Sequence, residues 1–136
     1  MSDIIQYQGD DIQVNIKIVE ADLSLLYTDV VAKKIITLPA NAMLLEINCK
    51  VLTEFDDSGF NSFDCGIIGE LDCFTSGRNL PAGGLNPASS VPYHDQTFRD
   101  NMFIDVDTDV YATFEGLNGD ATQGEMKFYF RYAILP

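Results

Sequence analysis

The stretch of sequence that decides the fold covers residues 43–70 and reads MLLEINCKVLTEFDDSGFNSFDCGIIGE. In its first half apolar and polar side chains alternate, which is typical of a strand with one face in a core and the other in water. The apolar face of this strand is predicted to carry Leu45, Ile47, Cys49, Val51 and Phe55. The acidic segment DDSG at 56–59 is typical of a tight turn, and apolar side chains return at every second position after it. We therefore predict an antiparallel hairpin at the centre of an all-β domain.

The same alternation recurs before and after this hairpin. Residues 11–20 and 126–134 alternate most regularly, whereas residues 29–38 are rich in β-branched side chains and end before Pro39. A further alternating run begins near residue 102, and no segment has helical periodicity. About seven or eight strands separated by turn signals favour a jelly-roll-like antiparallel β-sandwich.

The 136 residues are predicted to form one domain preceded by a short arm. Residues 1–10 are mostly polar and end in a Gly-Asp turn signal, so we interpret them as an N-terminal arm and residues 11–136 as a single sandwich. Glycine, proline, serine and asparagine dominate residues 76–97, which predicts a long loop.

Composition and charge exclude several classes of protein. Apolar residues make up 46% of the chain, too many for a disordered one. The formal charge of −13 argues against binding to nucleic acid through phosphates and against attraction to anionic membranes. Neither a signal peptide nor a membrane-spanning run is recognised, so synthesis in a cytoplasm is expected.

The three cysteines are predicted to be structural. An odd number without an export signal argues against a disulfide framework, and Cys49 and Cys65 fall on the apolar faces of their strands. Neither a basic neighbour nor a Cys-x-x-Cys spacing supports a nucleophile or a metal thiolate.

One acidic run resembles the opening of a calcium loop. Asp105, Asp107 and Asp109 have the right spacing, but Val110 and Gly116 stand where an EF-hand needs Gly and Glu. A solvated acidic strand is the favoured interpretation, with a weak Ca²⁺ or Mg²⁺ site as the alternative.

No arrangement of residues indicates an enzyme, and no cofactor is expected. His94 is the only histidine, and its neighbours Ser89, Ser90 and Asp95 lack the context of a catalytic triad. Adjacent acids at 10–11 and 56–57 are better explained as turn residues than as a glycosidase pair.

Four residues are candidate interface anchors. Leu80, Leu85 and Tyr93 are apolar positions in or beside the predicted loop, where they could contact a neighbouring chain. Tyr129 is predicted to face outward between two basic residues, an environment that is common at interfaces.

Several short phrases resemble a group of small tailed-phage virion proteins, the decoration (cement) and head-fibre-base proteins. The resembling phrases are ITLPANA at 36–42, TEFDD at 53–57 and FDCGIIG at 63–69, followed by a strand at 111–114 and an aromatic strand at 128–132. The acidic run at 105–109 and the three cysteines depart from this pattern.

This resemblance implies a non-enzymatic β-sandwich that forms a homotrimer, binds the major capsid protein on the outer capsid surface and stabilises the shell. The protein would then be a virion component that is made in the host cytoplasm. Two alternatives from other classes remain. One is a carbohydrate-binding module of a fibre or adhesin, with or without dependence on calcium, and the other is a small esterase or glycosidase that uses His94.

Overall fold

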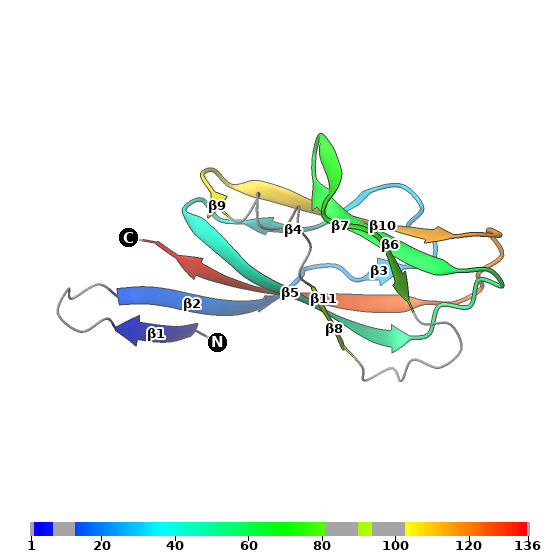
Figure 1. Cartoon of the computed structure of the whole chain (residues 1–136), viewed down its shortest axis with the longest axis horizontal. Coiled ribbons are helices and arrows are strands. Elements are labelled where there is room, and N and C mark those ends of the chain that lie inside the picture. The colour runs from blue at the N-terminus through cyan, green and yellow to red at the C-terminus, as the bar shows by residue number, and fades with distance from the viewer. Residues whose placement is uncertain (1, 7–12, 81–89, 94–102, 136) are drawn as a thin grey trace.

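The computed structural model describes residues 2–6, 13–80, 90–93 and 103–135, which form two antiparallel sheets (Figure 1). The large sheet has the order β1-β2-β11-β5-β8, with β3 beside β11 and β9 beside β5. Its strands are β1 (Ser2–Gln6), β2 (Gln13–Glu20), β3 (Leu25–Leu26), β5 (Ala42–Thr53), β8 (Ser90–Tyr93), β9 (Phe103–Ile104) and β11 (Glu125–Ile134). The small sheet has the order β4-β10-β6-β7 and consists of β4 (Lys33–Leu38), β6 (Asn61–Ile67), β7 (Glu70–Leu80) and β10 (Thr108–Gly116).

This architecture confirms the predicted all-β antiparallel sandwich. The strands exceed the predicted seven or eight, partly because β3 and β9 have only two residues each and are too short to show alternation. Strand β7 runs on to Leu80 and β8 covers residues 90–93, so these parts of the predicted 76–97 loop are extended. The remainder of that prediction lies outside the described residues. No helix in the described ranges is long and apolar enough to cross a membrane.

The predicted central hairpin is wrong, although both of its strands exist. Strand β5 pairs with β11, β8 and β9 in the large sheet, whereas β6 pairs with β10 and β7 in the small sheet. Residues 54–60 therefore carry the chain from one sheet to the other. Alternation shows which face of a strand is buried, and the apolar faces of β5 and β6 meet across the core as facing layers rather than side by side.

A bulge in β5 corrects the predicted face of Leu45. Arg131 pairs with Glu46 and Tyr132 with Leu44, so Leu45 is an extra residue without an opposite partner. The bulge turns Leu44 into the core, where it is fully buried, while Leu45 is only half-buried. The remaining predicted core positions of this stretch, Ile47, Cys49, Val51 and Phe55, are buried.

Aromatic side chains join the two sheets. The rings of Phe63 on β6 and Phe128 on β11 meet edge to face with centroids 5.6 Å apart. Phe55 stacks on Phe114 of β10 at 4.8 Å, and Phe130 lies beside Phe128 at 6.4 Å. These geometries are favourable for aromatic pairs and add to the large apolar area that each ring buries.

All three cysteines are buried and none forms a disulfide, which confirms the structural interpretation of Cys49 and Cys65. Burial raises the pKa of the Cys65 thiol well above its ordinary value, and it also raises the pKa of Cys73. The thiols therefore act as small apolar groups in the core.

Replacing Phe128 with alanine should lower the free energy of unfolding by about 3–5 kcal/mol, because the substitution leaves a cavity between the sheets. Lys127→Ala is the matched control, since the adjacent side chain lies on the outer face and its ion pair with Glu20 is partly exposed. That control should cost no more than about 1 kcal/mol. Urea unfolding of both variants measures the difference, and similar losses would contradict the assignment of faces.

Aspartates tie together the two connections at one end of the sandwich. Asp57 accepts hydrogen bonds from the backbone N–H groups of Gly59 at 2.8 Å, Asn118 at 3.0 Å and Asp120 at 3.1 Å. Its neighbour Asp56 accepts from the backbone N–H of Thr122 at 2.7 Å in the same way. The 54–60 connection is thereby bound to the 117–124 connection, and both cross between the sheets.

These hydrogen bonds change the acidity of both groups. Burial raises the pKa of Asp57, but the backbone N–H donors of Asn118, Gly59 and Asp120 outweigh it, so that its pKa lies below the ordinary value. The Thr122 hydroxyl and backbone N–H likewise lower the pKa of Asp56.

The fold should therefore lose stability in acid through these two carboxylates. A depressed pKa in the folded state means that their contribution is complete above the ordinary aspartate pKa of about 4 and is lost as the pH falls through the lower folded-state values. Asp57→Asn should lower the melting temperature at pH 7 and flatten its decline below pH 4. Thermal unfolding followed by circular dichroism between pH 2 and pH 7 tests this, and an unchanged acid profile in the variant would contradict it.

Candidate functional site

Of the four predicted interface residues, the structure describes the side chains of Leu80 and Tyr129. Leu80, at the end of β7, is 5% exposed and belongs to the core. Tyr93 is the last residue of β8 and pairs with Ile47, whereas Leu85 lies outside the described residues. Tyr129 is half-buried on the outer face of the large sheet, whereas Leu80 belongs to the small sheet and its side chain is buried in the core.

The outer face around Tyr129 carries charged side chains of both signs. Tyr129 lies between Asn48 of β5 and Glu20 of β2, and the next pair on the same face is Lys127 with Lys50. Arg131, two residues further along β11, is exposed. Tyr129 is thus placed between two bases on one face of the strand, as its sequence position predicts.

The acidic run serves as a set of local hydrogen-bond acceptors. Asp107 Oδ1 accepts from the backbone N–H of Ala40 at 2.8 Å, and Asp109 Oδ1 accepts from the Thr37 hydroxyl at 2.6 Å. The Thr37 hydroxyl is the largest cause of the lowered pKa of Asp109, and the Lys34 ammonium at 3.5 Å adds to it. Within the described ranges no group of three His, Cys, Asp or Glu residues could hold a metal ion. His94 lies outside these ranges.

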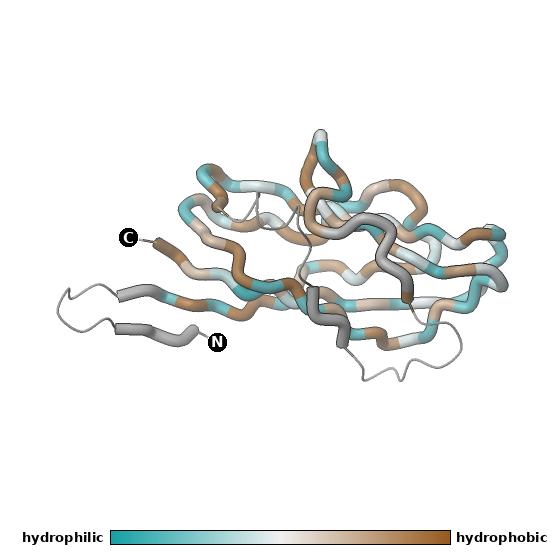
Figure 2. Tube along the Cα trace, in the orientation of Figure 1, coloured by the Kyte–Doolittle hydropathy of each residue, from teal (hydrophilic) through white to brown (hydrophobic). Residues whose placement is uncertain are grey.

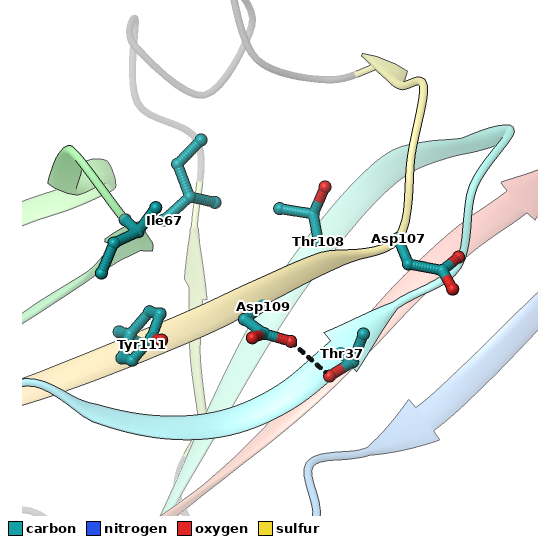
Figure 3. Close-up of a pocket in the computed structure, with 7 residues that line it drawn as sticks. Thr37, Ile67, Asp107, Thr108, Asp109 and Tyr111 are labelled. Atoms are coloured by element: carbon teal, nitrogen blue, oxygen red, sulfur yellow. Dashed lines mark hydrogen bonds between the residues drawn. The ribbon is translucent and has the colours of Figure 1, made fainter.

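A recess of about 370 Å³ opens on the outer face of the small sheet beside these aspartates (Figure 3). Strands β4 and β10 supply its polar wall, and the end of β6 with the following turn supplies its apolar wall. The lining residues are Thr37, Ile67, Ile68, Asp107, Thr108, Asp109 and Tyr111. We call this hollow the outer recess.

The turn between β6 and β7 projects from the sheet and forms the apolar side of the outer recess; it is the green turn at the top of Figure 1. Register shifts between Phe63 and Cys65 and between Cys65 and Ile67 disturb the β6–β7 ladder. Such irregularities bend a two-stranded ribbon. At the tip, Ile68 is 73% exposed, and the same turn is partly brown in the hydropathy view of Figure 2.

Two glycines make this turn possible. A Cβ atom at Gly66 would lie 2.3 Å from the backbone oxygen of Glu70, so the folded-back chain leaves room only for hydrogen there. Gly69 has a φ of 86°, a left-handed conformation that glycine adopts without steric cost. The glycine-flanked pair of isoleucines, GIIG at 66–69, was the sequence signal that could have identified this turn. Alternation alone missed it, because Ile68 simply breaks the pattern.

Gly66→Ala should destabilise the fold more than Gly69→Ala. The first substitution forces a side chain against backbone, whereas a Cβ at Gly69 meets nothing within 4 Å and only the φ angle is unfavourable. We expect about 1–2 kcal/mol for Gly69→Ala and a clearly larger loss for Gly66→Ala. Urea unfolding at neutral pH checks the order, and the reverse order would contradict the close backbone approach.

The comparison with known sequences gives no relative: no protein-family profile matches the chain, and no curated protein does. Solved structures do match. A chain from the cyanophage Pam1 capsid asymmetric unit has a TM-score of 0.65 and 18% identity, with 97% of this chain and 93% of the other covered. The chain has the fold of a phage capsid chain.

Two other capsids contain the same fold. The match to the acidic stable capsid structure of Helicobacter pylori bacteriophage KHP30 has a TM-score of 0.60 at 10% identity and covers 98% of this chain and 93% of the other. The match to the capsid of Ralstonia phage GP4 has a TM-score of 0.58 at 14% identity and covers 100% and 91%. The likeness therefore extends over whole chains of similar length and is not confined to a shared subdomain.

Proposed function

We propose that this chain is a non-enzymatic structural protein of a virion, a decoration (cement) protein that binds the outer capsid surface and stabilises the shell. The observation that carries the proposal is the whole-length likeness to chains of three phage capsid structures. The decoration role comes from the resemblance of the phrases at 36–42, 53–57 and 63–69 to decoration and head-fibre-base proteins.

The physical character of the chain agrees with this role. A shell stabiliser needs a rigid body that presents side chains at fixed positions, and the aromatic contacts between the two sheets supply rigidity. Binding to a shell and to other copies of the chain would use outward-facing side chains on more than one side. The Tyr129 face of the large sheet and the outer recess of the small sheet are two such surfaces.

In this proposal the chain assembles as a homotrimer, with the major capsid protein as its partner in the virion. Tyr129 is the proposed anchor between copies, and Leu85 and Tyr93 extend that contact from the 76–97 segment. Residues 1–10 serve as an arm: β1 is an edge strand of the large sheet and pairs with β2 from Ser2 opposite Lys17 to Gln6 opposite Gln13 (Figure 1). Among the described strands β1 pairs only with β2, so its outer edge could add a strand from a neighbour.

The proposal predicts that the purified chain binds shells of the virus that encodes it. Shells prepared without the protein should retain it on co-sedimentation and should resist heating better after it is added. Shells that neither retain the protein nor gain heat resistance would refute the decoration role.

The oligomeric state is tested separately by light scattering with and without calcium. A trimer has three times the chain mass of 15.1 kDa, and we expect this mass both with and without calcium. If the free chain is a monomer, the same measurement is made on protein that is mildly cross-linked on shells and then released from them. A monomer that calcium stabilises and that binds glycans would instead support the carbohydrate-binding alternative. Tyr129→Ala tests the proposed anchor and should weaken trimer formation.

A further inference from the structure

We propose that the outer recess and the projecting Ile68 turn form a docking surface for an extended peptide segment that carries a Lys or Arg next to an aliphatic residue. The identification of that segment with a part of a shell subunit rests on the proposed function. The shape, the apolar wall and the charge of the recess define the chemistry of the segment that it would bind.

The size and position of the outer recess suit side chains of a peptide. Its volume of about 370 Å³ is at the lower end of the range for ligand sites, and it lies open on the face of a sheet. Asp109 and Tyr111 lie on the same side of β10, with Thr37 of β4 beside Asp109, and Ile67 lies at the end of β6 (Figure 3). Ile68, in the turn after β6, also lines the recess. A segment that crosses this face can place successive side chains against the turn and against the polar wall.

The apolar wall is arranged for contact with a partner. Single exposed apolar side chains are common on proteins, but Ile68 is 73% exposed at the tip of a projecting turn that depends on Gly66 and Gly69. Within the same turn and β7, Leu71 is 38% exposed, and Ile67 is partly buried against the core. An aliphatic side chain of the partner would bury this tip together with the rim of the recess.

The charge of the polar wall selects a basic partner. Asp107 and Asp109 line the recess. Asp105 and Glu70 are exposed and lie two residues from Asp107 and Ile68 in the sequence. Lys34 forms an ion pair with this wall, with its Nζ atom 3.5 Å from Asp109 Oδ1. The remaining carboxylates leave a negative surface, on a chain whose formal charge is −13. Such a surface attracts a Lys or Arg from a distance and orients it on arrival.

An Arg or Lys would also use the apolar lining. Its aliphatic stem can lie along Ile67 and Tyr111 while the cationic head reaches Oδ2 of Asp107. The other carboxylate oxygen of Asp107, Oδ1, accepts the hydrogen bond from the backbone N–H of Ala40. A guanidinium over the Tyr111 ring would gain a cation–π contact as well. The same arrangement disfavours an acidic partner, because two carboxylates would then meet in a partly apolar hollow.

The test uses two substitutions on the surface and measures binding to shells that lack the protein. Ile68→Glu removes the apolar tip, and Asp107→Lys reverses the charge of the polar wall. Each should weaken binding about tenfold or more, which is typical of a central interface residue. Binding of the unmodified chain should weaken as salt is raised, and Asp107→Lys should reduce that salt dependence.

Matched controls separate this surface from general changes of charge. Val31→Glu introduces the same charge at a side chain that is 77% exposed between β3 and β4, and Glu115→Lys matches Asp107→Lys at the other end of β10. Both controls should bind like the unmodified chain. Ile68→Glu and the two controls should unfold cooperatively near the unmodified melting temperature, because each changed side chain is exposed. Asp107→Lys also loses the hydrogen bond from Ala40, so its binding is measured well below its own melting temperature.

Each outcome has a distinct meaning. If the unmodified chain binds shells and both recess variants bind equally well, the docking surface is refuted while the decoration role stands. Competition by a free glycan, but not by a short peptide with adjacent Val and Arg, would also refute the basic-peptide inference. Failure of the unmodified chain to bind shells would refute the decoration role. In that case saturable binding of the Val-Arg peptide, lost in Asp107→Lys, would still support the recess chemistry, and absence of that binding would refute it.

Discussion

The edge-to-face contact between Phe63 and Phe128 is the interaction on which the rest of the structure depends, because it fixes the two sheets as facing layers. Once Phe128 points inward, strand alternation turns Tyr129 to the outside of the large sheet. On β10, the inward Val110 and Ala112 likewise turn Asp109 and Tyr111 toward the outer recess. The outer surfaces are thus consequences of the packing within.

The two connections at one end of the sandwich depend on the same layering. A chain that alternates between sheets must cross the edge of the core, where backbone N–H groups lose their strand partners and need other acceptors. The paired carboxylates of Asp56 and Asp57 meet this need for the 117–124 connection. Gly116 lies so close to Asp57 that a Cβ atom there would be 2.3 Å from Oδ2. The turn acids found in the sequence therefore hold two crossovers together.

Much of the fold could be predicted from the sequence, because one-sided burial produces alternation. The regular pattern of 126–134 and the buried positions of Ile47, Cys49 and Val51 follow directly from it. Alternation does not say which strand lies beside which, so β5 and β6 could be read as a hairpin although they face one another across the core. Nor does alternation reveal that the register shifts at Leu45. Leu44 and Leu45 are both apolar, so either of them could occupy the buried face of the strand.

The candidate site was harder to predict than the fold. Of the candidates chosen from the sequence, Asp107 and Asp109 lie in the outer recess, but as acceptors for Ala40 and Thr37. Leu80 was chosen as an apolar residue near a loop, and it fills the core instead. The recess itself depends on a backbone approach at Gly66, which becomes visible only when the chain folds back on its own strand.

The buried cysteines have a practical consequence for the study of this chain. Thiols react with alkylating reagents as thiolates and only where the reagent can reach them. Cys49 and Cys65 are buried between the sheets, and the pKa of the Cys65 thiol is raised. An alkylating reagent can therefore label these thiols only when the two sheets separate. The native sequence therefore contains its own probe of transient opening. The rate of maleimide uptake by the folded chain would report how often this sandwich opens, without any engineered label.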